Sequence, residues 1–211
     1  YGTCHLASIC LPKFVEDTYT VDELKLPEDQ QRQLNHEFPT NPKIDYKKLV
    51  EIAGVTCRNL NKVIDKNLYP CEEAKRSSVR GRPIGIGVQG LADVMYKFKT
   101  PFDSTLAKSI NKKIFEAIYF GALSASTELA KKEYQEAKKH SDDGSNISKT
   151  FGSYPAYLDN GGSPLANGEF NWQMYGIEEK NLFGMFDWQT LRDHIRVFGV
   201  RNSLLTALMP T

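Results

Sequence analysis

The sequence predicts an α/β protein with parallel strands. Stretches with helical periodicity alternate along the chain with short apolar stretches that are typical of strands. The predicted order is strand, helix, strand, helices, helix, strand, and no internal repeat interrupts it. This alternation is typical of parallel sheets whose strands are connected by helices.

The first predicted strand covers residues 3–11, TCHLASICL, and Pro12 closes it. An extended backbone places Cys4 and Cys10 on one face of this strand. They would stand about 20 Å apart at roughly 3.3 Å per residue, which is too far for a disulfide. Residues 16–43 are charged and contain three prolines, so we expect a surface excursion that can include a short hairpin.

The first predicted helix covers residues 45–68. Apolar residues recur there at steps of three and four and form one stripe. Asp45 is a suitable N-cap, and Pro70 ends the pattern. Residues 72–82 are polar and basic, so we expect a solvated connection there rather than a strand.

The stretch 82–93, RPIGIGVQGLAD, reads as a short apolar strand that runs directly into a helix. That helix covers residues 91–98, and Pro101 breaks the pattern. A longer helix follows, capped by Ser104 and extending to about residue 139. Small side chains along it predict close packing against a neighbouring element. They are Gly121, Ala122, Ser124, Ala125 and Ser126.

The last part of the chain is predicted to be a long loop followed by one helix and one strand. Residues 141–168 are rich in Gly, Ser, Asn and Asp, which is typical of a loop. The helix covers residues 187–198, with Gly199 at its C-terminus. Residues 201–209, RNSLLTALM, form the final predicted strand.

Composition narrows the class of protein. The chain has 211 residues and a formal net charge of +1, so its charge favours neither nucleic acid nor a membrane surface. It has no run of 18 apolar residues and no N-terminal signal pattern, and we expect a cytoplasmic protein. The four cysteines form no C-x-x-C motif, so no zinc or thioredoxin-type site is predicted. Both ends fall within core-type segments, which favours a piece of a longer protein.

The glycines of the stretch 82–93 allow two interpretations. Gly85, Gly87 and Gly90 have the G-x-G-x-x-G spacing of dinucleotide-binding turns, which makes a nicotinamide- or flavin-binding module one alternative. However, only Pro83 and Ile84 precede the first glycine, and no second strand ending in an acidic residue follows about twenty positions later, because that region is predicted to be helical. The other interpretation is a strand whose glycines allow backbone or ligand to approach closely.

Six stretches, in order, resemble the catalytic subunit of class I ribonucleotide reductase. They are CHLASI (4–9), NLNKVIDKNLYP (59–70), RPIGIGVQGLAD (82–93), NKKIFEAIYFGALSAS (111–126), GSPLANGEFNWQMY (162–175) and GVRNSLLTALMPT (199–211). The resemblance implies that residues 1–211 are one partial barrel domain, beginning and ending inside that domain. The implied fold is α/β, part of a ten-stranded α/β barrel that is incomplete in this segment.

The resemblance implies reduction of ribonucleoside diphosphates to deoxyribonucleotides by radical chemistry with a redox-active cysteine pair. Cys4 matches one member of that pair, and its partner lies outside this chain. A thiol suits the role because it can donate protons and electrons and can be regenerated by thiol exchange. Pro210 and Thr211 match the start of the turn that holds the substrate diphosphate, where backbone N–H groups suit an anion.

The resemblance also implies the partners. The chain itself would carry no cofactor and no metal. A metal-containing small subunit would supply the radical, and thioredoxin or glutaredoxin would supply electrons. The full-length subunit would be a homodimer that contacts the remainder of its own barrel and binds neither DNA, RNA nor membrane. The radical cysteine, the allosteric region and the tyrosine relay fall outside the chain.

Two residues depart from the family pattern. His5 stands where asparagine is usual, and Leu208 stands where proline is usual. Two further alternatives stay open. A cobalamin-dependent relative shares the barrel and the cysteine pair, and the chain could be an inert fragment that only pairs with the rest of the barrel.

Overall fold

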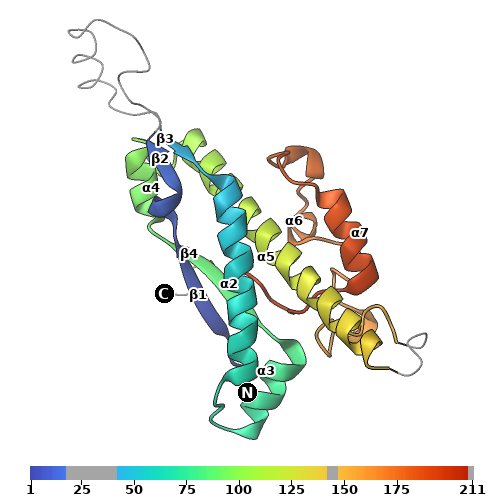
Figure 1. Ribbon diagram of the computed structural model, residues 1–211. Coiled ribbons are helices and arrows are strands. Elements are labelled where there is room, and N and C mark those ends of the chain that lie inside the picture. Colours follow the sequence, from blue (N-terminus) through green and yellow to red (C-terminus); the bar gives the residue numbers. More distant parts are fainter. Residues whose placement is uncertain (18–41, 142–146, 209–211) are drawn as a thin grey trace, which may run out of the picture.

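Figure 1 shows a computed structural model of the chain, in which residues 1–17, 42–141 and 147–208 are described. The elements are β1 (His5–Cys10), η1 (Leu11–Phe14), β2 (Val15–Asp17), β3 (Pro42–Ile44), α2 (Tyr46–Lys66), α3 (Glu72–Gly81), β4 (Ile84–Gln89), α4 (Leu91–Lys97), α5 (Thr105–Lys139), η3 (Asp159–Gly161), α6 (Asn171–Met174), η4 (Glu179–Asn181) and α7 (Trp188–Phe198). The structure therefore confirms a mixed helix and strand protein.

Strands β1 and β4 form a parallel two-stranded sheet. His5 lies opposite Ile84, and Cys10 lies opposite Gln89. The chain passes from β1 to β4 through α2 and α3, because parallel neighbours need a long connection. The parallel arrangement predicted from the sequence is confirmed for this pair.

The prediction of a final strand over residues 201–209 is wrong for the described residues 201–208, which form no strand and only follow the other edge of β4. Leu204 O accepts from Ile84 N at 3.0 Å, and Leu205 O accepts from Ile86 N at 2.9 Å. The two donors are two residues apart while the two acceptors are adjacent, so a regular ladder cannot continue. One parallel bridge, between Ile86 and Thr206, is all that forms in the part described.

The long helices lie beside one another on one side of the strands. In Figure 1, α2 lies across β1 and β4, α5 lies beside α2, and α7 packs on the far side of α5. The predicted close packing along α5 is confirmed at Gly121. A Cβ atom built there would lie 2.3 Å from Val50 O, so the α2 and α5 backbones meet at this glycine.

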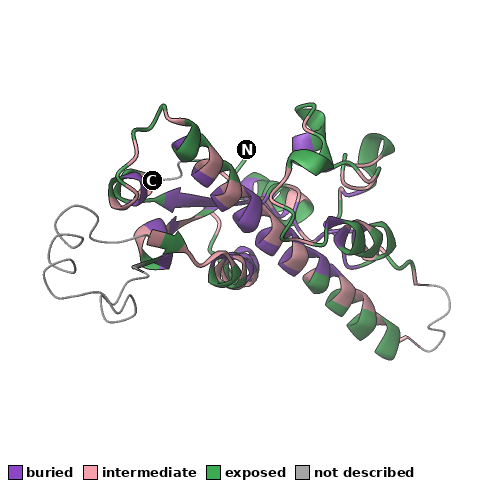
Figure 2. Ribbon diagram, turned by 90° about the horizontal axis from the view of Figure 1, so that it is seen from above, coloured by how far each residue is buried: buried purple, intermediate pink, exposed green. Residues whose placement is uncertain are grey.

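The core lies where these helices meet the strands. Figure 2 shows buried residues along β4 and the middle of α5, while the C-terminal turns of α5 are exposed; in β1 only His5 and Ile9 are buried. The predicted apolar stripe of α2 faces inward in part, because Val63 and Leu68, which were counted in it, are exposed. Its buried members are Leu49, Ala53, Cys57, Leu60 and Ile64.

Three helix starts have side-chain caps, of which the sequence predicted those at Asp45 and Ser104. Asp45 Oδ1 accepts from Lys48 N at 2.9 Å at the start of α2. Ser104 Oγ accepts from Ala107 N at 3.0 Å at the start of α5. Asp187 Oδ1 accepts from the backbone N–H three residues later, at 2.9 Å, at the start of α7. Each cap satisfies a backbone N–H that has no partner within its helix.

Two parts of the prediction need correction. Residues 72–81 form helix α3, where a solvated connection was expected. Only Ala74 and Ser78 of this helix are buried, so it has no apolar stripe that periodicity could detect. The short helix α6 was also not anticipated. The base of the expected excursion is an antiparallel pair, β2 with β3, and residues 18–41 lie outside the described part.

Candidate functional site

The candidate site lies on the face of the sheet opposite the helices. On β1, His5 and Ile9 are buried, while Leu6 between them is 49% exposed. Because side chains alternate along a strand, Leu6 points away from the helix-covered face. Cys4 comes directly before β1 and is exposed, and this alternation places its side chain on the same face as Leu6. The structure therefore places Cys4 on the face that the helices do not cover.

Three side chains from neighbouring segments gather over Gly85 of β4 on that face. A Cβ atom built at Gly85 would lie 2.6 Å from Leu6 Cδ2, 3.0 Å from Ala207 Cβ and 3.4 Å from Cys4 Sγ. Partial burial raises the pKa of the Cys4 thiol, since desolvation disfavours the thiolate. The neutral thiol is thus the favoured form of this side chain.

The segment that carries Cys4 is attached to helix α3. The hydroxyl groups of Thr3 and Ser78 are within hydrogen-bonding distance, and Ser78 is fully buried. The helix that the sequence did not reveal therefore contacts the residue before Cys4.

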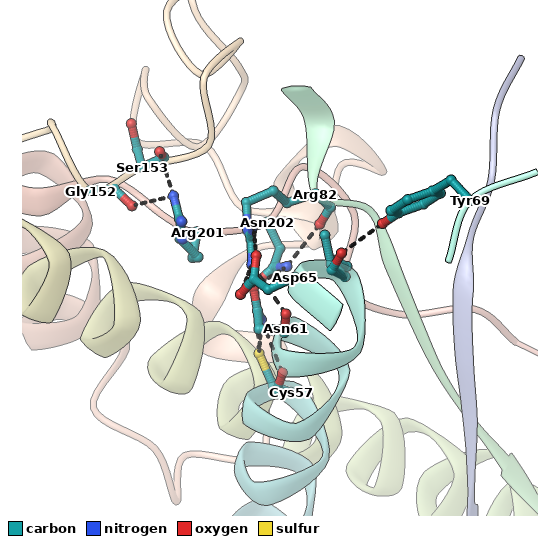
Figure 3. A network of polar contacts seen from close by, with 10 residues as sticks. Cys57, Asn61, Asp65, Tyr69, Arg82, Gly152, Ser153, Arg201 and Asn202 are labelled. Carbon is teal, nitrogen blue, oxygen red and sulfur yellow. Dashed lines mark hydrogen bonds and ion pairs between the residues drawn. The ribbon is translucent and has the colours of Figure 1, made fainter. Parts of the chain in front are cut away.

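A buried polar network fixes the beginning of β4 and of the C-terminal segment (Figure 3). Asn202, which is 0% exposed, donates from Nδ2 to the Arg82 carbonyl at 2.8 Å and to Asn61 Oδ1 at 3.1 Å. Its Oδ1 accepts from Asn61 Nδ2 at 2.9 Å and from Ser126 Oγ at 2.9 Å. The Asn202 side chain thus joins α2, α5 and the residue that leads into β4.

Arg82 adds a charged contact to this network. Its guanidinium is almost fully buried and pairs with Asp65 through two hydrogen bonds, of 2.6 Å and 3.1 Å. The backbone of Arg82 is left-handed, with φ of 46° and ψ of 47°, a conformation that is uncommon for residues other than glycine. These side-chain contacts hold the turn in that conformation between α3 and β4.

The other cysteines have different surroundings. All four cysteines are free thiols. Cys57 is buried in α2, and burial raises the pKa of its thiol to about 12, so it is a core residue. Cys10 ends β1, and Cys71 is exposed just before α3.

His5 lies on the opposite side of β1 from the candidate site. It is buried, and its ring makes an edge contact with Tyr69 at a centroid distance of 6.0 Å. The departure from the family pattern at this position therefore faces the helices rather than Cys4. Leu208, the other departure, is exposed. Pro210 and Thr211, the predicted diphosphate-binding residues, lie outside the described part.

The glycine motif does not have the geometry of a dinucleotide site. Gly85 and Gly87 lie inside β4 rather than at the turn that follows it. Gly90 does occupy the turn, with φ of 78°, but α4 behind it has only 7 residues. The strand interpretation of the glycines fits this arrangement.

A further cavity lies away from the face of the sheet that carries Cys4. A cavity of about 210 Å³ between α5, α6 and α7 is lined mainly by aromatic and apolar side chains, including Tyr119, Trp172 and Trp188. Its lining includes neither Cys4 nor Gly85. Within residues 1–17, 42–141 and 147–208, no group of three or more His, Cys, Asp and Glu side chains is placed to hold a metal ion. No helix in those ranges is both long and apolar enough to cross a membrane.

Comparison with known proteins places this geometry in a family. The model of the "ribonucleotide reductase, barrel domain" family matches residues 1–211. The ribonucleoside-diphosphate reductase large subunit of Acanthamoeba polyphaga mimivirus is 41% identical over 211 residues, which cover 100% of this chain and 19% of the relative. The corresponding large chain of Encephalitozoon cuniculi is 41% identical over 100% of this chain and 21% of its own length. The Caenorhabditis elegans large subunit is 39% identical over 100% of this chain and 23% of its own length. The chain spans about one fifth of the length of these relatives, and it belongs to the ribonucleotide reductase barrel-domain family.

Proposed function

We propose that this chain is part of the catalytic subunit of a ribonucleoside-diphosphate reductase. The observation that carries the proposal is the match of the whole chain to the barrel domain and to large subunits at about 40% identity. Residues 1–211 would form one section of a ten-stranded α/β barrel. In that barrel β1, β4 and the segment after Asn202 would lie side by side in the wall. In that barrel the face bearing Cys4 would point inward, where the substrate binds.

Cys4 would be one of two thiols that reduce the ribonucleotide. The two thiols lose two protons and two electrons and become a disulfide. The substrate takes up both electrons and both protons, so that its 2′ hydroxyl leaves as water and hydrogen replaces it. Exposure of Cys4 on the face away from the helices supports this role, because the thiol must reach both substrate and partner cysteine. Burial of Cys57 argues against that residue for the same task.

The remaining parts of the reaction would come from outside this chain. A metal-containing small subunit would supply the radical, and thioredoxin or glutaredoxin would reduce the disulfide after each turnover. The diphosphate would bind at the turn that begins with Pro210 and Thr211, and the full-length subunit would form a homodimer. The 211-residue chain alone should therefore show no turnover. A nicotinamide- or flavin-binding module is not favoured, because two of the three motif glycines lie within β4.

The test is multiple-turnover reduction of a ribonucleoside diphosphate by the full-length subunit with the small subunit and thioredoxin. Cys4→Ser should keep the fold, because the volume change is small, and should abolish turnover, because serine cannot form a disulfide. Cys10→Ser, at the other end of the same strand, is the matched control and should keep the wild-type rate. Wild-type turnover by Cys4→Ser would show that Cys4 is not the redox cysteine.

A further inference from the structure

The cavity between α5, α6 and α7 is the feature from which this inference starts. In Figure 1, α6 and α7 lie beside α5 on the side away from α2. The ring centroids of Trp172 and Trp188 are 4.9 Å apart, and the Tyr119 ring lies 5.9 Å from that of Trp188. Phe115 and Tyr175 also line the cavity, whose volume is about 210 Å³. The cavity is therefore walled by aromatic rings and has the size of a small head group rather than of a large ligand.

A carboxylate lies in this aromatic wall. Glu116 of α5 is 8% exposed and lines the cavity. Its Oε2 accepts from Phe183 N at 2.7 Å, and its Oε1 accepts from Trp188 Nε1 at 3.4 Å. Trp188 and Leu182, the residue before Phe183, belong to the same lining. Because a carboxylate can accept about four hydrogen bonds, these two donors leave part of its capacity unused.

The negative charge of Glu116 has no partner cation within the part of the chain that the structure describes. Lys112, one turn earlier, also lines the cavity, but its ammonium donates to a backbone carbonyl of η4. The Lys113 ammonium lies over the Phe183 ring, 4.6 Å from its centroid. Arg192 of α7 pairs with a carboxylate of η4. A buried charge without an opposite charge is costly, so a cation in the cavity would be stabilised by Glu116.

We propose that this cavity binds the head group of a small organic ammonium compound. The faces of Trp and Tyr rings attract cations, most strongly where the cation is removed from water, and Glu116 adds an opposite charge. A single carboxylate supplies too few oxygen ligands for a calcium or magnesium ion, whereas the methyl groups of an alkylammonium pack well on aromatic rings. The site lies apart from Cys4, so it is independent of the proposed function.

The experiment titrates the 211-residue chain with choline, which carries a trimethylammonium group. The neutral comparison is the choline analogue in which a tert-butyl group replaces the trimethylammonium group, so that shape is kept and charge is removed. Both tryptophans of the chain line the cavity, and their fluorescence therefore reports its occupation. Choline should give a saturable change and should bind at least about tenfold more tightly than the neutral analogue.

Three substitutions test the role of charge. Glu116→Gln keeps the side-chain volume and an oxygen for Phe183 N, and it should weaken choline binding about tenfold, because the opposite charge is lost. Lys112→Gln should tighten binding about two- to threefold, because it removes a positive charge from the cavity lining. Glu128→Gln is the matched control. It removes the same charge from an exposed position of α5 outside this cavity and should change the affinity less than about twofold.

Several results would overturn the proposal. They are the absence of a saturable choline response, equal affinity for the neutral analogue, and unchanged affinity in a Glu116→Gln chain that is folded by circular dichroism. Binding of a peptide that carries trimethyllysine without binding of choline would also overturn it, because the occupant would then be a partner protein.

A second variant serves if Glu116→Gln does not fold. Tyr175 is 82% exposed and lines the cavity, so Tyr175→Ala should keep the fold and weaken choline binding about threefold. Unchanged affinity in that variant would count against the site. Choline binding involves neither turnover nor Cys4, so its failure and the failure of the Cys4→Ser turnover test are distinguishable.

Discussion

The contact between α2 and α5 predicts opposite effects for the same substitution at two glycines. Gly54 and Gly121 face each other in the middle of these helices, and glycine in a helix interior costs about 1 kcal/mol relative to alanine. At Gly54 a new Cβ would meet its nearest neighbours at 3.4 to 3.6 Å, which is ordinary packing. Gly54→Ala should therefore stabilise the chain by up to about 1 kcal/mol.

At Gly121 the same change meets backbone. The new Cβ would lie 2.3 Å from Val50 O and 3.0 Å from Val50 Cα, so the helices must separate by on the order of 1 Å to restore a normal contact. Overpacking of this kind costs about 1–3 kcal/mol or more, which exceeds the gain in helix propensity of about 1 kcal/mol. Gly121→Ala should therefore be destabilising by up to about 2 kcal/mol, or about 4–8 °C in Tm for a domain of this size.

Urea denaturation followed by circular dichroism measures both variants on one scale. Because the two substitutions are chemically identical, the unfolded-state contribution is nearly the same, and the difference between them reports the helix contact. Equal shifts for the two variants, or a Gly121→Ala chain as stable as the unchanged one, would refute the close approach of α2 and α5.

Three further predictions concern the network, a cap and the core thiol. Asn202→Ala leaves several buried partners without hydrogen bonds and should cost about 1–3 kcal/mol in urea denaturation, whereas Asn171→Ala, at an exposed side chain, should change little. Hydrogen bonds from Thr190 lower the pKa of Asp187, so its contribution is present above the unfolded-state pKa of about 3.9 and is lost as pH falls through the folded-state pKa. The stability difference between the unchanged chain and Asp187→Asn should accordingly be largest near neutral pH and vanish in acid, and a constant difference would exclude this origin. Cys57, with a thiol pKa of about 12, should resist alkylation at pH 8 until urea unfolds the chain, and labelling of the native chain would contradict its burial.

The sequence predicted those helices whose signals lie within the helix itself, namely a periodic apolar pattern and a capping residue. The helices now seen as α2, α5 and α7 were predictable because apolar spacing and a capping residue coincide, as at Asp45 and Ser104. Helix α3 was missed because its sequence, EEAKRSSVRG, has almost no apolar face. Its attachment comes instead from Ser78, which meets Thr3, and from Arg82, which binds residues of α2. Contacts between residues so far apart along the chain leave no periodic signal.

The candidate site likewise depends on contacts between residues that are far apart in the sequence and that the sequence does not predict. Cys4 could be located through the resemblance of its surrounding stretch, and the structure places it on the face away from the helices. The neighbours that define its position could not be located in that way. Leu6 and Ala207 meet over Gly85 only once three segments lie side by side, and Asn61 meets Asn202 across 141 residues of sequence. Polar residues such as these two asparagines are ordinarily taken as surface residues, and only the folded chain reveals that both are buried.

The buried network and the site are connected through strand register. A shift of one residue between neighbouring strands transfers every side chain to the opposite face. Asn202 binds the Arg82 carbonyl between two backbone hydrogen bonds that join these parts of the chain, from Ser203 N to Gly81 O and from Ile84 N to Leu204 O. Because the amide of Asn202 is also held by α2 and α5, this contact allows one alignment of the two segments. That alignment brings Ala207 of the C-terminal segment to Gly85, whereas the pairing of Leu6 with Gly85 sets which residue of β4 lies beside Cys4. The polar network thus determines which residue of the C-terminal segment reaches the candidate site.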